Sequence, residues 1–194
     1  MYGMVNRGIR DLVLHIADEE AWLTICAAAG ISNTTFSNTT VYDDAITYDL
    51  VAAASETLGM EPSAVLEQFG RHWILFTGQQ GWGPLFDIAG RDLRSFVHGL
   101  EAMHSRVQAS MPDCRMPSFA VEDDGDGGLV IDYRSEREGL ASMVLGLFRG
   151  LVEHFDEGWE IEQAGNRKDD GYDRFVLRPL TVGAKESGER VGTA

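Results

Sequence analysis

The sequence contains little cysteine, few basic residues and no long hydrophobic run. Cys26 and Cys114 lie far apart and in no spacing typical of metal ligands, so neither a disulfide framework nor a zinc site is indicated. Only 16 lysines and arginines stand against 31 acidic residues, and the net charge of -15 disfavours nucleic acids and anionic membranes as partners. No segment approaches about 18 consecutive apolar residues, which excludes a typical transmembrane helix.

The start of the sequence also lacks the features of a secretory signal. Residues 1–7 contain no basic segment followed by an apolar one, and we therefore expect a cytoplasmic protein. A length of 194 residues and a hydrophobic content of 44% are typical of one globular domain with a substantial core. We expect this domain to span residues 1–180. Residues 181–194 contain two valines and no aromatic residue, which predicts a disordered tail.

The spacing of the hydrophobic residues differs between the two halves of the sequence. The first half has the 3.6-residue period of helices, and most of the second half alternates as strands do. Helices are predicted over 4–29 (two helices), 43–58, 62–76, 85–89, 92–107 and 140–154, with a turn at 81–84. Strands are predicted over 119–121, 129–135, 159–163 and 172–177. Helices followed by a meander with one inserted helix indicate an α+β fold, with the helices gathered on one side of an antiparallel sheet.

The strand predicted over 129–135 has one face that begins with apolar side chains and ends with polar ones. Because alternate side chains of a strand share a face, Tyr133, Ser135 and Arg137 would point the same way. A phenol, a hydroxyl and a guanidinium together form a receptor for carboxylates or phosphates, which arginine binds with two hydrogen bonds. A structural alternative exists, since Ser135 and Glu138 have the spacing of a capping box and Tyr133 could be a strand-edge aromatic.

His104 lies on the apolar stripe of the helix predicted over 92–107. A histidine in such a position is usually a hydrogen-bonded core residue. The functional alternative is a metal ligand that faces an apolar cavity. Leu100 and Met103 beside it offer none of the further ligands that zinc needs, whereas haem iron needs one protein ligand because the macrocycle supplies four. Haem also carries two propionates at its edge, which matches the polar face around Tyr133.

These residues resemble a known family, the H-NOX (haem nitric oxide and oxygen binding) domains, which are relatives of the haem domain of soluble guanylate cyclase. The resemblance covers almost all of residues 1–180. Its most specific part is the motif Tyr133-x-Ser135-x-Arg137 with His104 upstream. The other matching segments are residues 1–6, 69–73, 100–107 and 116–119.

The resemblance implies roles for individual residues. It implies that His104 is the proximal iron ligand of haem b and that Pro117 presses on the porphyrin and bends it. Tyr133, Ser135 and Arg137 would bind the propionates. The residues expected to contact the ring are Leu100 and Met103 near the iron ligand, and Val5, Ile9, Trp73, Ser142, Met143 and Leu147 on the opposite, distal side.

The resemblance also suggests which gas is bound. Oxygen-binding relatives carry a distal tyrosine that donates a hydrogen bond to dioxygen, at about Ser142 by ungapped counting from Tyr133, and this chain has none there. We therefore expect a sensor, not an enzyme, that binds nitric oxide and carbon monoxide and excludes oxygen. Nitric oxide would weaken the iron–His104 bond. The signal is expected to pass to a separate protein with a basic docking face, a sensor histidine kinase or a cyclic-di-GMP enzyme.

Two other functions stay open on the residues alone. A haem enzyme such as a peroxidase or oxygenase needs a distal acid–base group or a thiolate ligand, and residues 140–151 offer no well-placed histidine or arginine. A carrier of a bilin, a lipid or another apolar carboxylic acid would use the polar face around Tyr133 without His104. The visible absorption spectrum distinguishes these possibilities.

Overall fold

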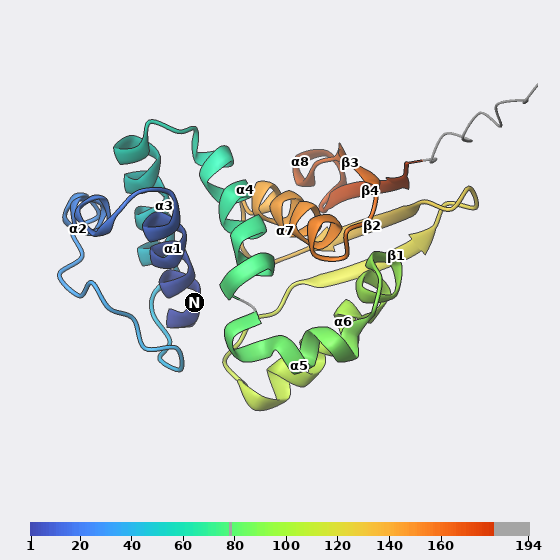
Figure 1. Cartoon of the computed structure of the whole chain (residues 1–194), viewed down its shortest axis with the longest axis horizontal. Coiled ribbons are helices and arrows are strands. Elements are labelled where there is room, and N and C mark those ends of the chain that lie inside the picture. The colour runs from blue at the N-terminus through green and yellow to red at the C-terminus, as the bar shows by residue number, and fades with distance from the viewer. Residues whose placement is uncertain (78, 181–194) are drawn as a thin grey trace, which may run out of the picture.

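The computed structural model describes residues 1–77 and 79–180 and confirms the α+β class (Figure 1). Its helices are α1 (Gly3–Ile16), α2 (Glu19–Ala28), α3 (Asp44–Leu58), α4 (Pro62–His72), the π-helix η1 (Trp73–Thr77), α5 (Gln79–Ala89), α6 (Leu93–Ser110), α7 (Ala141–His154) and α8 (Arg167–Asp170). Its strands are β1 (Ser118–Asp123), β2 (Leu129–Arg134), β3 (Trp159–Gly165) and β4 (Asp173–Pro179). They form one antiparallel sheet in the order β1-β2-β4-β3. The tail predicted to be disordered, residues 181–194, lies outside the described residues.

Several helix ends follow directly from local sequence. Asp18, Asp43 and Asp92 are the N-cap residues of α2, α3 and α6, and each carboxylate accepts a hydrogen bond from a backbone N–H of the first turn. Gly59 ends α3 in the left-handed conformation, with φ 65°. These ends confirm the predicted boundaries, because a cap depends only on residues within one turn.

The chain forms two packed regions that meet at α4 and α7. Figure 1 shows α1, α2 and α3 on one side of α4, and α7 with the sheet on the other side. The helical region, α1 to α4, buries Trp22 and Phe69. The sheet region, α5 to α7 with β1 to β4, buries Phe148 and Phe175. Trp73 packs against both cores, so the two regions share an apolar boundary.

Glycines allow α4 and α7 to cross at very short range. A Cβ atom added to Gly146 would lie 2.0 Å from the carbonyl oxygen of Glu67, and one added to Gly70 would lie 2.1 Å from that of Met143. Neither distance is compatible with a side chain. An ion pair between Arg149 and Glu67 lies at the same crossing. The crossing therefore fixes where the α7 side chains lie relative to the helical region.

The turn expected at residues 81–84 is wrong, because α5 continues through Pro84. A proline inside a helix removes one backbone hydrogen bond and crowds the preceding turn. The cost is offset by packing between α5 and α6, where the ring centroids of Phe86 and Phe96 lie 5.3 Å apart. Tertiary contacts thus overrule a local turn signal.

The single helix expected over 62–76 is divided. The α-helix α4 ends at His72, and η1 continues it with the wider π-helical turn. The change of period rotates the following side chains, so that Phe76 is 43% exposed. Of the described residues, no helix is both long and apolar enough to cross a membrane.

Candidate functional site

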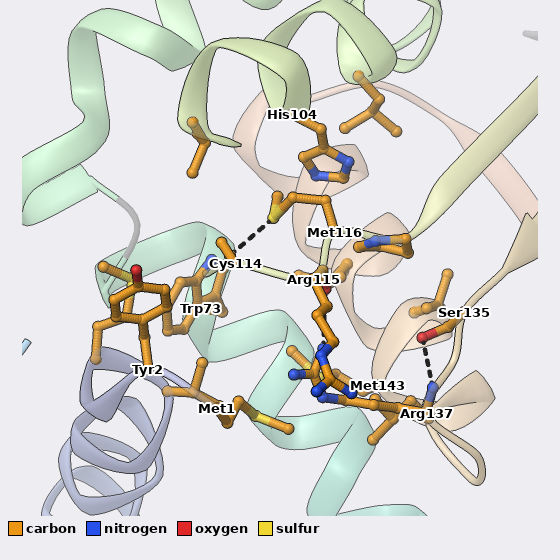
Figure 2. A pocket seen from close by; sticks show the side chains of 18 of the residues that line it. Met1, Tyr2, Trp73, His104, Cys114, Arg115, Met116, Ser135, Arg137 and Met143 are labelled. Carbon is orange, nitrogen blue, oxygen red and sulfur yellow. Dashed lines mark hydrogen bonds between the residues drawn. The ribbon is translucent and has the colours of Figure 1, made fainter. Parts of the chain in front are cut away.

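A cavity of about 280 Å³ lies where the two regions meet. Figure 2 shows His104 on one side of this space and Met143 on the opposite side, with Ser135 and Arg137 at one edge. The walls are mostly apolar, as is usual for small-molecule sites. Every residue that the sequence predicted to contact a haem ring, except Ser142, lines it: Val5, Ile9, Trp73, Leu100, Met103, Pro117, Met143 and Leu147.

His104, on α6, is half-buried in the cavity wall. Its ring centroid lies 5.6 Å from that of Phe119. Burial lowers the pKa of the imidazole below its ordinary value, while the backbone carbonyl of Pro117 and the Glu101 carboxylate oppose this shift. The neutral ring is the form that binds metals. Its Nδ1 atom is buried without a hydrogen-bond partner, as is that of His72, but His104 lines the cavity and His72 does not.

Tyr133 and Ser135 occupy the cavity edge at the end of β2. Burial raises the pKa of the Tyr133 phenol, which keeps it protonated and able to donate. The Ser135 hydroxyl accepts a hydrogen bond from the backbone N–H of Arg137, at 3.1 Å. The capping-box alternative is wrong, because the N-cap of α7 is Leu140, which makes no side-chain cap bond. Ser135 therefore organises the segment before the helix rather than the helix itself.

Arg137 already holds a carboxylate. Its Nε and Nη2 atoms donate to the two carboxylate oxygens of Asp44, at 2.8 and 3.3 Å, and its Nη1 donates to the carbonyl of Arg115 at 2.9 Å. The N-terminal ammonium of Met1 also donates to Asp44. Burial raises the pKa of Asp44, but Arg137 and the ammonium outweigh it, so that the pKa is lowered and the group is ionised. The fork of Arg137 is thus placed to bind a carboxylate at the cavity edge.

Sequence reasoning missed Asp44 as a partner of Arg137. Asp43 caps α3, whereas the neighbouring Asp44 turns to Arg137. The two partners are 93 residues apart in the chain, and no sequence period connects them. Arg115 was missed as well, although it lines the cavity two residues before Pro117.

The α7 residue that faces the cavity also differs from the one that ungapped counting from Tyr133 indicates. Ser142 is not part of the cavity wall, whereas Leu140, Met143, Val144 and Leu147 are. These four positions share one face of α7 through its 3.6-residue period. Of these two neighbouring positions Met143 lines the cavity and Ser142 does not, and the helical period was the signal that could have shown it.

The fold and the site define a class of protein, an α+β domain with an apolar cavity whose edge carries carboxylate-binding groups. Within the part of the chain that the structure describes, no group of three or more His, Cys, Asp or Glu side chains could hold a bare metal ion. Haem fits the donors that are present. The His104 imidazole in the cavity wall suits its iron, apolar walls suit its ring, and Arg137 with Tyr133 and Ser135 suits its propionates.

Comparison with known proteins shows the family. A family model described as haem-NO-binding (HNOB) matches residues 2–163, and the chain belongs to this family, the H-NOX domains. It is 27% identical over 181 residues to soluble guanylate cyclase gcy-33 of Caenorhabditis elegans, covering 93% of this chain and 19% of that protein. The match to guanylate cyclase soluble subunit beta-2 of Rattus norvegicus is 29% over 115 residues, covering 54% and 17%. The chain thus spans about a fifth of the length of these relatives.

Solved structures agree with the fold. An H-NOX protein from S. oneidensis in the Fe(II)NO ligation state superimposes with a TM-score of 0.84 and 16% identity, covering 93% of this chain and 99% of that chain. An Fe(II) unliganded H-NOX protein from K. algicida gives a TM-score of 0.77 and 20% identity, covering 93% and 97%. Domains of this family bind haem and serve as gas sensors rather than catalysts.

Proposed function

We propose that a single domain spanning residues 1–180 binds haem b and senses nitric oxide and carbon monoxide while excluding oxygen. The observation that carries this proposal is the position of His104. Its imidazole lies in the wall of an apolar cavity, and Arg137 at the edge of that cavity binds the carboxylate of Asp44. A carrier of an apolar acid would have no use for an imidazole in this wall.

Each wall of the cavity has a part in holding the cofactor. His104 would be the iron ligand, and Tyr133, Ser135 and Arg137 would hold the propionates by hydrogen bonds and charge. Pro117 would press on the ring from the side of His104. When bound, the haem would supply an iron centre that can take a diatomic gas.

The α7 wall supports the selectivity. Its cavity-lining side chains have no N–H or O–H group that could donate a hydrogen bond, and they are Leu140, Met143, Val144, Leu147, Phe148 and Leu151. Bound dioxygen carries partial negative charge and gains strongly from a donor, whereas nitric oxide and carbon monoxide need none. The α7 wall therefore offers bound dioxygen no hydrogen-bond donor.

The output would come from α6. We propose that nitric oxide binding releases His104 and that α6 then shifts relative to the helical region. The surface presented to an effector changes as a result. We further propose, from the family resemblance, that the effector is a separate sensor histidine kinase or cyclic-di-GMP enzyme. Its docking face would be basic, because the chain has a net charge of -15. Binding to such an effector should weaken as salt concentration rises, and salt-independent binding would contradict this charge argument.

The absorption spectrum tests the proposed function. The reduced, haem-loaded protein should show a five-coordinate high-spin spectrum that is unchanged in air and shifts with nitric oxide and with carbon monoxide. A stable oxy spectrum would overturn the exclusion of oxygen. Uptake of an apolar carboxylic acid without uptake of haem would instead support the carrier, and turnover of hydrogen peroxide with an electron donor would support a haem enzyme.

A further inference from the structure

The segment that carries the carboxylate-binding groups is held from outside the cavity by Arg167. We name residues 135–138 the clamp segment. The Nη1 atom of Arg167 donates to the backbone carbonyls of Ser135 and Arg137, at 2.5 and 3.2 Å. Arg167 begins α8, between β3 and β4, and does not line the cavity. It belongs to no motif that the sequence displays.

The clamp segment needs such a support because it is neither strand nor helix. The strand β2 ends at Arg134 and α7 begins at Ala141, so the carbonyls between them have no partners from a regular ladder. Arg167 binds two of these carbonyls. A third, that of Glu138, accepts a hydrogen bond from the Tyr48 hydroxyl of α3 at 3.0 Å. The backbone of the clamp segment is thus fixed from the sheet region and from the helical region.

Arg167 is itself fixed in place. Its backbone N–H donates to the Asp173 carboxylate at 3.2 Å, which ties α8 to the start of β4. Asn166 caps α8 by accepting a hydrogen bond from the Lys168 N–H, at 3.0 Å. The Arg167 side chain is 37% exposed, and the Glu138 carboxylate lies 4.0 Å from its Nη2 atom. It can therefore hold the clamp segment without being buried in the cofactor site.

We propose that Arg167 is a positioning residue for the haem propionates, an inference that rests on the proposed function. By fixing the carbonyls of Ser135 and Arg137, it sets the direction in which the Arg137 fork and the Ser135 hydroxyl reach the cavity edge. Arginine suits this task because its planar guanidinium carries several donors in a rigid arrangement. Loss of Arg167 would loosen the groups that bind the propionates, while His104 and the apolar walls stay unchanged.

This separation makes the proposal testable with haem and haem dimethyl ester, which lacks the propionate charges. The rate at which each cofactor leaves the reduced protein is measured with an excess of a haem-scavenging globin. Arg167→Ala should speed the loss of haem about tenfold, as expected for lost support of hydrogen bonds to a charged group. It should leave the loss of the dimethyl ester unchanged within about twofold. Arg167→Lys should restore part of the haem retention.

Arg178→Ala is the matched control. Arg178 lies on β4, pairs with Glu162 at 3.1 Å and has a side chain 52% exposed. It does not line the cavity and makes no contact with the clamp segment among the bonds described. Its replacement removes the same charge and a comparable ion pair, so the loss of both cofactors should keep its wild-type rate.

The outcomes separate this proposal from the proposed function. Equal acceleration for haem and its ester would show a general structural role and overturn the positioning role, as would an unchanged haem loss. If the alanine variant does not fold, Arg167→Gln, which keeps most of the side-chain volume, takes its place. Its loss of haem is then compared with its loss of the dimethyl ester in the same way. The propionate bending bands in the resonance Raman spectrum should shift in the Arg167 variants only. Failure of the wild type to take up haem would instead refute the proposed function.

Discussion

Arg137 donates hydrogen bonds to both carboxylate oxygens of Asp44, from Nε at 2.8 Å and from Nη2 at 3.3 Å. Asp44 begins α3 in the helical region, and Arg137 follows β2 in the sheet region. The pair therefore joins the two regions at the edge of the cavity. The same guanidinium is proposed to bind a haem propionate. The Asp44 carboxylate and the propionate would therefore compete for Arg137.

Asp44→Asn tests this competition. The substitution should lower the free energy of unfolding of the haem-free protein by about 1 kcal/mol, because it removes a partly exposed ion pair. It should also slow haem loss several-fold, since the propionate then has no competing carboxylate. Urea unfolding and haem transfer to a globin measure the two effects. Glu19→Gln, which breaks the exposed pair with Arg10, is the control and should leave haem loss unchanged; faster haem loss from the Asp44 variant would contradict the prediction.

His104→Gly should abolish haem retention unless free imidazole is supplied. Imidazole can enter the space left by the side chain and bind the iron in its place, which a purely structural histidine would not allow. The haem content of the purified protein, with and without imidazole, is the measurement. His98→Gly is the control, because His98 lies on the same helix but not in the cavity wall. Normal haem content in the His104 variant without imidazole would remove its role as ligand.

Met143→Tyr should create oxygen binding. A tyrosine at a position that lines the cavity brings a hydroxyl donor toward a bound gas, and dioxygen gains most from such a donor. Ser142→Tyr places the same group on the neighbouring position, which does not line the cavity, and should leave the spectrum in air unchanged. A stable oxy spectrum in the Ser142 variant alone would show that the face of α7 has been wrongly assigned.

Gly146→Ala should destabilise the protein by about 2 kcal/mol or more through overpacking. The new Cβ would lie 2.0 Å from the Glu67 carbonyl oxygen, so α4 and α7 would have to separate. Gly158→Ala is the control, because its nearest neighbour would be an ordinary 3.5 Å contact with Leu180. Denaturant unfolding of both variants measures the difference. Equal stability of the two would show that the crossing adapts freely.

The stability of the protein should depend on the protonation of His72. This side chain is 7% exposed and stacks on Phe76, with ring centroids 4.8 Å apart. Burial, followed by the nearby His15, lowers the pKa of His72 from 6.5 to about 4. The unfolded chain thus takes up a proton at higher pH than the folded chain, and acid favours unfolding between these two values.

The contribution of His72 is therefore fully present above about pH 6.5 and is lost as the pH falls toward 4. The loss amounts to about 3 kcal/mol at one protonation site. Unfolding free energies of the wild type and of His72→Gln, compared across this range, isolate the effect, because glutamine does not titrate. The difference between the two proteins should shrink as the pH falls. A difference that is constant with pH would place the folded-state pKa of His72 near its ordinary value.

Much of the fold was predictable because it depends on local chemistry. Apolar periodicity separated the helical half from the strand-rich half, and side-chain caps such as Asp92 placed helix ends within one turn. The candidate site was predictable to the same degree. His104 lies on the apolar stripe of one helix, and Tyr133, Ser135 and Arg137 lie within five residues of one another, although the strand ends at Arg134 and the last two follow it.

By itself, then, the sequence determined the fold class, the family and the residues that carry the chemistry of the proposed site. Only the tertiary structure decided which groups those residues meet: Asp44 in the fork of Arg137, Arg167 behind the clamp segment, and Met143 rather than Ser142 in the cavity wall. The physical reason is that each of these depends on how elements distant in sequence pack, and on the rotation of α7 where its glycines cross α4. Local periodicity carries no information about either.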